Sequence, residues 1–228
     1  MDTIKNVEVY GLENSIKASK YPMAIDVSKC TDEITERTIS LGSVQTGTGH
    51  DNFLKGIVVQ FDWTFTPKCS VEVERYHFID FVSSQSTMHR ITKFDLDKAY
   101  INYTDKRCIN VIKELVEEYN NLENKTTDYA KELYLRILYS NPCGMFLTAR
   151  MTTNYQQLKT IYQQRRYHRL PEWQWFCDWC ETLPYFIELT QIKVDNSKNL
   201  WYNIYIKKNK EKNNDKERKV YWRNWRHY

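Results

Sequence analysis

The alternation of apolar and polar positions is cleanest between Ile57 and Phe65. Every second residue of that run is apolar, and Gln60, Asp62 and Thr64 lie between them. A period of two residues is typical of a strand with one buried face. A shorter alternating run at residues 7–10 predicts a second strand, which ends at Gly11.

Helical spacing of apolar residues dominates the rest of the chain. One stripe runs from Val71 to Val82, ahead of a hydroxyl-rich turn at residues 83–87, and another runs from about Thr148 to Gln164. Such spacing is typical of amphipathic helices. Further helices are predicted at residues 14–19, 31–42, 109–119, 129–137 and 171–182, and a last strand at residues 201–206. The mixture predicts an α+β fold with a small, mainly antiparallel sheet and several helices.

Charge is divided unevenly along the chain. Residues 201–228 hold nine Lys and Arg against three acids, a net charge of +6, whereas the whole chain carries +4. Residues 1–200 therefore carry −2. We expect a single domain over residues 1–206 and a basic tail over residues 207–228. The tail's basic and aromatic residues allow nucleic-acid binding through phosphate contact and base stacking. The alternative is a packing strand followed by a solvated extension, so nucleic acid is expected only through this tail.

The composition is that of an ordinary globular protein, with 27% charged and 41% hydrophobic residues. No apolar run is long enough to cross a membrane, and the N-terminus lacks a basic region followed by an apolar one. We therefore expect a cytoplasmic protein with no membrane contact.

Residues 173–180 combine an aromatic run with a Cys177-Asp178-Trp179-Cys180 motif. Such spacing suits a redox pair or half of a zinc site, but no second pair and no nearby histidines complete a metal site. We interpret the two cysteines as buried thiols and expect no metal. We interpret the aromatic run as core rather than as a platform for base stacking.

Residues 72–90 concentrate groups that suit a phosphorylated ligand. Arg75, His77, His89 and Arg90 accompany three serines there. Arginine offers a forked charged donor and serine a short hydrogen bond, the two contacts that phosphate groups need.

The same residues carry a resemblance to a known family. Arg75-Tyr76-His77, followed by eight residues and then Ser86, resembles the signature of flavin-dependent thymidylate synthases, which is Arg-His-Arg, seven or eight residues, then Ser. Tyr76 and His77 depart from that signature, and Glu72 stands where the family usually has glutamine.

Three flanking segments extend the resemblance to roughly residues 5–185. Gly49–His50 is similar to a Gly-His element whose histidine approaches the flavin. Arg136 is placed like an arginine that reaches the nucleotide phosphate of a neighbouring subunit. Asn154–Glu172 is similar to the family's C-terminal helix, with Asn154 and Arg165 expected on one helical face.

The resemblance implies a homotetramer that binds FAD and methylates dUMP reductively, with methylenetetrahydrofolate and NADPH as co-substrates. It implies a catalytic role for Arg165. The residues implied to bind substrate are Glu72, Arg75, Ser84, Gln85, Ser86, Arg136 and Arg165. The residues implied to bind the cofactor are His50, Arg75, His77, Asn154 and His168.

Two alternatives stay open at this stage. A diverged flavin enzyme would modify another pyrimidine nucleotide. A non-enzymatic protein of the same fold would bind nucleotide or nucleic acid without flavin.

Overall fold

The computed structural model describes residues 3–192 of the chain. The fold described below belongs to the unit that ends at Gln191. The predicted strand at residues 201–206 and the basic tail lie outside the described residues. The domain boundary at residue 206 stays a prediction.

A four-stranded antiparallel sheet organises this unit. Its strands are β1 (Ile4–Tyr10), β2 (Val58–Phe65), β3 (Asp80–Ser84) and β4 (Leu147–Asn154), in the spatial order β1-β2-β4-β3. Every neighbouring pair runs antiparallel. The predicted α+β fold with a small antiparallel sheet is therefore confirmed.

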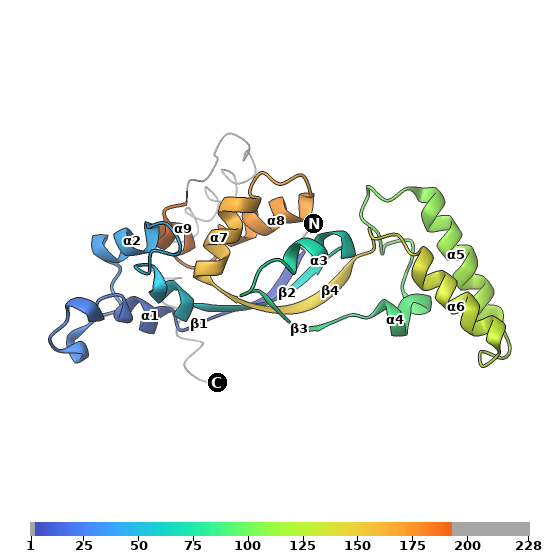
Figure 1. Ribbon diagram of the computed structural model, residues 1–228, viewed down its shortest axis with the longest axis horizontal. Coiled ribbons are helices and arrows are strands. Elements are labelled where there is room, and N and C mark those ends of the chain that lie inside the picture. The colour runs from blue at the N-terminus through green and yellow to red at the C-terminus, as the bar shows by residue number, and fades with distance from the viewer. Residues whose placement is uncertain (1–2, 193–228) are drawn as a thin grey trace, which may run out of the picture. The chain divides into compact units, whose positions relative to one another are not determined.

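Helices follow and connect the strands, and Figure 1 shows α2, α7, α8 and α9 on one face of the sheet. They are α1 (Leu12–Ala18), α2 (Glu36–Ser43), α3 (Pro67–Val73), α4 (Thr87–Arg90), α5 (Lys106–Asn121), α6 (Asp128–Ser140), α7 (Tyr155–Arg165), α8 (Pro171–Cys180) and α9 (Phe186–Thr190). Among the described residues, no helix is long and apolar enough to cross a membrane.

Aromatic packing between β2 and α8 forms the main core. The rings of Trp63 and Trp173 lie 5.5 Å apart, and those of Trp63 and Phe176 lie 4.6 Å apart. All three side chains are fully buried. Large buried rings contribute both apolar area and favourable edge contacts. The interpretation of this aromatic run as core is confirmed for Trp173 and Phe176, whereas Trp175 and Trp179 are only partly buried.

Cys177 and Cys180 are also fully buried in α8, as free thiols. Burial raises the pKa of Cys177 to about 12, so its reactive thiolate is scarce at neutral pH. Their interpretation as buried thiols is confirmed. Within residues 3–192, no group of three or more His, Cys, Asp and Glu side chains could hold a metal ion.

A second hydrophobic cluster lies between α5 and α6. Ile112, Leu133, Ile137 and Met145 are fully buried in it. A bridge between Tyr100 and Met145 continues this cluster toward the start of β4. The apolar stripes predicted at residues 109–119 and 129–137 are thereby confirmed as helices.

The predicted helix over residues 71–82 is wrong after Val73. Helix α3 ends at Val73, and residues 80–84 form β3 instead. Strand β3 pairs with β4, with Phe81 opposite Met151. Pairing with a neighbouring strand, a tertiary interaction, therefore outweighs the helical spacing of these residues. The predicted turn at residues 83–87 is likewise replaced by the end of β3 and the start of α4.

The predicted helix over residues 148–164 is wrong in its first half. Residues 147–154 form β4, and α7 begins only at Tyr155. Met151 in β4 and Tyr155 in α7 are both buried and lie four residues apart, so their spacing resembles that of one continuous helix. Helix α2 also begins later than predicted, because Thr35 rather than Thr31 caps it through a reciprocal capping box.

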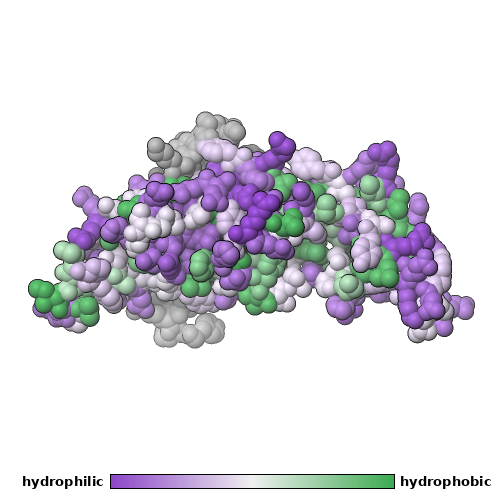
Figure 2. All heavy atoms as spheres, viewed as in Figure 1, coloured by the Kyte–Doolittle hydropathy of each residue, from purple (hydrophilic) through white to green (hydrophobic). Residues whose placement is uncertain are grey.

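Strand β3 forms an exposed edge of the sheet. All five of its residues are exposed, including Phe81 and Val82, and its register against β4 shifts between Phe81 and Ser83. A second exposed apolar group comprises Met23, Ile25 and Val27, in the segment after α1. Figure 2 shows this group as a green tip at the left of the view. Exposed apolar groups of this kind mark candidate association surfaces.

Glu181 makes the stability of this unit dependent on pH. One of its carboxylate oxygens accepts a hydrogen bond from Tyr162 at 2.6 Å, and the other is buried without a partner. Burial is the main cause that raises the pKa of Glu181 above its ordinary value of 4.5. The folded state thus holds this proton more tightly than the unfolded state. Protonated Glu181 therefore contributes to the stability of the folded state at acidic pH, and this contribution is lost as the pH rises above about 4.5.

We expect Glu181→Gln to flatten this pH dependence, because glutamine does not titrate. Thermal unfolding between pH 4.5 and neutrality measures it. Asp178→Asn is the control, since Asp178 also pairs with Arg166 but is exposed. Equal pH slopes in the wild-type protein and Glu181→Gln would contradict the assignment.

Candidate functional site

The candidate site lies where α3 and the end of α7 approach each other. Thr66 caps α3 by accepting a hydrogen bond from the Cys69 amide at 3.2 Å, and Pro67 follows at the first helical position. At the other helix, Asn154 caps α7 by accepting from the Gln157 amide at 3.0 Å. These caps fix the two helix starts, and Arg165 follows at the last turn of α7.

Arg165 is held by three neighbours. Its Nη2 lies 3.1 Å from the carboxylate of Glu72, and its Nε donates to the Tyr76 hydroxyl at 2.7 Å. Its guanidinium carbon lies 5.5 Å and 5.3 Å from the ring centres of Tyr76 and Trp173. The Arg165 side chain is only 13% exposed. Ion pairing, hydrogen bonding and ring contact therefore fix one orientation of the guanidinium group.

Tyr76 extends this arrangement to a further side chain. Its hydroxyl donates to Gln164 Oε1 at 2.9 Å while accepting from Arg165. Burial is the main cause that raises the pKa of Tyr76 above its ordinary value. The hydroxyl therefore stays protonated, and its proton is committed to Gln164. Tyr76, one of the two residues that depart from the signature described above, thus accepts the hydrogen bond that orients Arg165 Nε.

Glu72 also pairs with Arg75. Arg75 Nη1 lies 3.2 Å from the same oxygen of Glu72 that faces Arg165. The Arg75 side chain is 67% exposed, so water screens this second pair and its contribution to stability is small. Arg75 therefore remains available to a ligand, whereas Arg165 is largely occupied.

His168 follows α7 and borders a pocket of about 860 Å³. Its Nδ1 accepts a hydrogen bond from the Leu170 amide at 3.2 Å, which leaves the ring proton on Nε2. Burial, together with the nearby positive charge of Arg165, lowers the pKa of His168 below its ordinary value. The neutral ring can donate a hydrogen bond through Nε2.

The pocket beside His168 is rich in cations. Lys68, Glu72, His168 and Arg169 line it, with Gln164 and other polar residues. Within residues 3–192, neither Lys68 nor Arg169 forms an ion pair. Arg165 itself does not line this pocket, because Glu72 lies on its wall instead. Glu72, which pairs with Arg165, is therefore the member of that ion pair that lines the pocket.

Among the described residues, the other predicted site residues make no contact of this kind with Arg165, although His77 directly follows Tyr76 in the chain. Within the described part of the chain, no hydrogen bond or ion pair joins any of them to the cluster around Arg165. His50 and His77 are exposed in turns, Ser84 is exposed in β3, Ser86 precedes α4, and Arg136 is exposed on α6. Gln85 is committed to β4, since its amide donates to the Thr148 carbonyl and its side chain accepts from the Thr148 amide, both at 2.9 Å.

Asn154 differs from its predicted placement on one face of a helix with Arg165. It stands just before α7 and caps it, so its side-chain oxygen is already used. The poor helix propensity of asparagine is explained by this position, where it is favoured.

A buried ion pair ties the segment that carries His50 to α7. Lys159 and Asp51 both have fully buried side chains, and Lys159 Nζ lies 3.1 Å from Asp51 Oδ2. The same Nζ donates to the carbonyls of Gly42, at 2.8 Å, and Val44. Gln156 donates to the other oxygen of Asp51 at 2.8 Å. The lysine positions the loop ahead of β2, yet a lysine on a helix gives no sequence signal for such burial.

Comparisons with known proteins place this fold. No protein-family model and no curated protein matches the chain. Two crystal structures of the flavin-dependent thymidylate synthase ThyX from Helicobacter pylori, both with FAD and dUMP, match with a TM-score of 0.59. Their identities are 11% and 12%, and the matches cover 81% of this chain and 96% of theirs. A UMP/dUMP methylase, PolB from Streptomyces cacaoi, bound with 5-Br dUMP, matches with a TM-score of 0.54 and 13% identity, over 82% of this chain and 92% of that one. The chain shares the fold of these nucleotide-methylating enzymes.

Proposed function

We propose that this chain is a flavin-dependent thymidylate synthase, which methylates dUMP reductively to dTMP with methylenetetrahydrofolate and NADPH. The observation that carries the proposal is the fixed Arg165 behind a cation-rich pocket of about 860 Å³. Such a pocket is large enough for a nucleotide, and its cations suit a phosphate group. The shared fold supports the same class of reaction.

The donor set near the pocket fits the diphosphate of FAD. Arg75, Lys68 and Arg169 are exposed cations, and His168 offers one neutral donor. In this proposal Arg75 and His168 hold the cofactor, and His50, His77 and Asn154 are further cofactor contacts. When bound, FAD supplies the redox chemistry that no side chain here can supply.

Arg165 and Glu72 bind and orient the nucleotide in this proposal. The nucleotide displaces Glu72 from Arg165, and the freed guanidinium donates to the uracil ring. A fixed positive charge there stabilises negative charge on a ring carbonyl oxygen, the charge that makes C5 nucleophilic toward the one-carbon unit, which is the catalytic role of Arg165. Arg75, Ser84, Gln85, Ser86 and Arg136 complete the substrate contacts.

A homotetramer in the cytoplasm is part of the proposal. Ser84, Ser86 and Arg136 lie outside the cluster around Arg165, so another copy of the chain is the natural source of these contacts. The exposed apolar residues of β3 and of the segment after α1 support association.

A diverged activity on another pyrimidine nucleotide is the second candidate. It is favoured by Glu72, whose carboxylate neutralises Arg165 and changes what the site accepts. The UMP/dUMP methylase among the structural neighbours supports this candidate. A non-enzymatic nucleotide-binding protein is the third.

The three candidates separate in one series of measurements. We expect the purified protein to be yellow with bound FAD and to form dTMP from dUMP when both co-substrates are supplied. Bound flavin with turnover of UMP but not of dUMP would select the diverged enzyme. A colourless protein that does not bind added FAD would contradict both enzymes and leave the binding protein.

A further inference from the structure

Glu72 offers one free carboxylate oxygen to the pocket of about 860 Å³ that it lines. Both of its ion pairs, with Arg75 at 3.2 Å and with Arg165 at 3.1 Å, use Oε2. Within residues 3–192, no hydrogen bond or ion pair uses Oε1 of Glu72. The side chain is 17% exposed. A ligand in the pocket can therefore donate to Oε1 while Oε2 stays paired.

The chemistry of this oxygen distinguishes the two common pyrimidine bases. A carboxylate accepts hydrogen bonds and donates none. Cytosine carries an amino group at position 4, which donates, whereas uracil carries there the carbonyl oxygen O4, which accepts. The amino group of cytosine is a regular partner of glutamate side chains in base recognition. A carbonyl oxygen at the same place would face a carboxylate oxygen with no proton between them, so Glu72 favours cytosine.

The pairing of Glu72 with Arg165 strengthens this preference. In the proposed reaction dUMP displaces Glu72 from Arg165, and both side chains are largely shielded from water, at 17% and 13% exposure. Breaking an ion pair of this kind costs free energy, because each charge loses its partner. A cytosine nucleotide avoids that cost, since its amino group needs only Oε1. The two bases thus differ both in the bond gained and in the pair lost.

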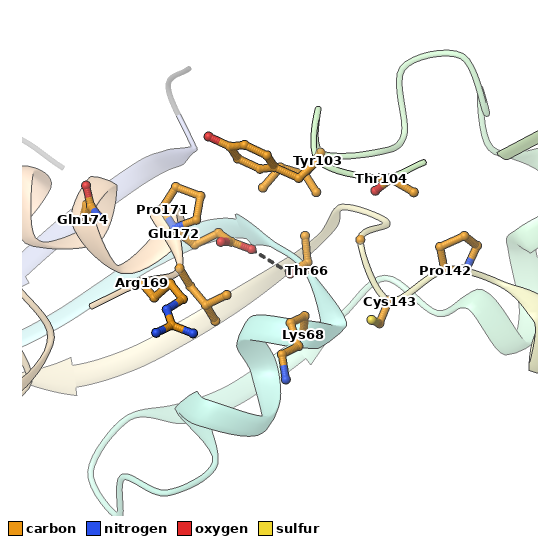
Figure 3. A pocket seen from close by; sticks show the side chains of 13 residues that line it. Thr66, Lys68, Tyr103, Thr104, Pro142, Cys143, Arg169, Pro171, Glu172 and Gln174 are labelled. Carbon is orange, nitrogen blue, oxygen red and sulfur yellow. Dashed lines mark hydrogen bonds between the residues drawn. The ribbon is translucent and has the colours of Figure 1, made fainter. Parts of the chain in front are cut away.

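The phosphate of a nucleotide finds its partners on the same wall. Lys68 and Arg169 line this pocket, and they also line an adjoining pocket of about 650 Å³. Figure 3 looks into the adjoining pocket and shows the charged ends of both side chains on the same side of Glu172. Two cations on one side suit a phosphate group, whichever base the nucleotide carries. The phosphate therefore supplies affinity, and Glu72 supplies the choice of base.

We propose that the nucleotide site prefers a cytosine nucleotide, such as 2′-deoxycytidine 5′-monophosphate (dCMP), over dUMP. The 4-amino group donates to Oε1 of Glu72, and the phosphate meets Lys68 and Arg169. The side-chain amide of Gln163, which also lines the pocket, is a donor suited to the O2 carbonyl of the base. This preference rests on the proposed nucleotide site and names the base that its second candidate function leaves open. Glu72 is the residue that determines specificity.

Isothermal titration calorimetry on the full-length protein tests this preference. We expect dCMP to bind about tenfold more tightly than dUMP. It should exceed by a similar factor the 2′-deoxyribonucleoside 5′-monophosphate of pyrimidin-2-one, which lacks only the amino group. Glu72→Gln should abolish or reverse the preference, because an amide can also donate to O4 of uracil. Glu74→Gln is the matched control, since Glu74 is exposed and does not line the pocket, and it should keep the preference.

The comparison of dCMP with its analogue without the amino group uses the wild-type protein, so it decides the matter even if Glu72→Gln does not fold. Equal affinity for these two ligands, or tighter binding of dUMP than of dCMP, would overturn the preference and leave the nucleotide site standing. An unchanged preference in folded Glu72→Gln would also overturn it. Binding of neither dCMP nor dUMP would overturn the proposed nucleotide site itself, and the preference with it.

Discussion

Replacing Lys159 by methionine is expected to lower the free energy of unfolding by about 3–5 kcal/mol. The side chains of Lys159 and Asp51 are completely buried, and methionine keeps the length of the lysine while removing its charge. Asp51 would remain buried with only Gln156 as a donor, and the carbonyls of Gly42 and Val44 would lose theirs. Removing one partner of a buried pair leaves an uncompensated charge, which accounts for the size of the loss. Urea denaturation followed by circular dichroism measures it.

The double variant Asp51→Asn with Lys159→Met is the matched control. It removes both charges, so we expect it to recover part of the stability that Lys159→Met loses. Lys131→Met, at an exposed pair on α6, should change stability by less than about 1 kcal/mol. A loss below about 1 kcal/mol for Lys159→Met would show that the buried pair contributes little.

Replacing Arg165 by alanine is expected to weaken dUMP binding about 10- to 100-fold, if the proposed function holds. Alanine removes the charged donors that face the base, and the neighbouring cations cannot reproduce their forked geometry. Glu72→Gln should act in the opposite direction and tighten dUMP binding severalfold, because Arg165 then loses its ionic partner. Isothermal titration calorimetry on the purified protein measures both changes.

Arg107→Ala serves as a control for general charge effects, because Arg107 pairs with Asp105 at the start of α5. It should leave dUMP affinity unchanged. Arg165→Lys keeps the charge without the fork and should give an intermediate loss. If Arg165→Ala binds dUMP as tightly as the wild-type protein, Arg165 is a structural residue that anchors Glu72 and Tyr76.

Elements whose conformation depends on their own pattern of apolar residues were predicted correctly, whereas an element that depends on a partner far away in the sequence was not. Strand β2 was predicted almost to the residue, since its alternation reflects one buried face. Helices α5 and α6 were predicted because their apolar stripes pack on each other. The helix predicted to include residues 80–82 was wrong because Phe81 and Val82 are exposed, so the spacing of these apolar residues does not reflect a buried face. The conformation of residues 80–84 depends on pairing with β4, about 70 residues later in the chain.

The sequence identified several residues of the candidate site, but it did not predict how their side chains contact one another. Glu72, Arg75, Tyr76 and Arg165 were all singled out from the sequence, but their mutual contacts depend on where α3 ends. Once α3 ends at Val73, the chain turns and brings Tyr76 onto Arg165. Lys68 gave no signal as a pocket residue, since an exposed lysine is ordinary anywhere on a surface.

The register shift in β3 limits how copies of this chain can join. An edge strand with regular pairing would offer a continuous row of amides and carbonyls to another strand. The extra residue between Phe81 and Ser83 interrupts that row and twists it locally. A sheet shared across two chains is therefore disfavoured at β3. Association through this edge must therefore use side-chain contacts. The side chains of β3, and not its backbone hydrogen-bonding groups, then determine which partner it recognises.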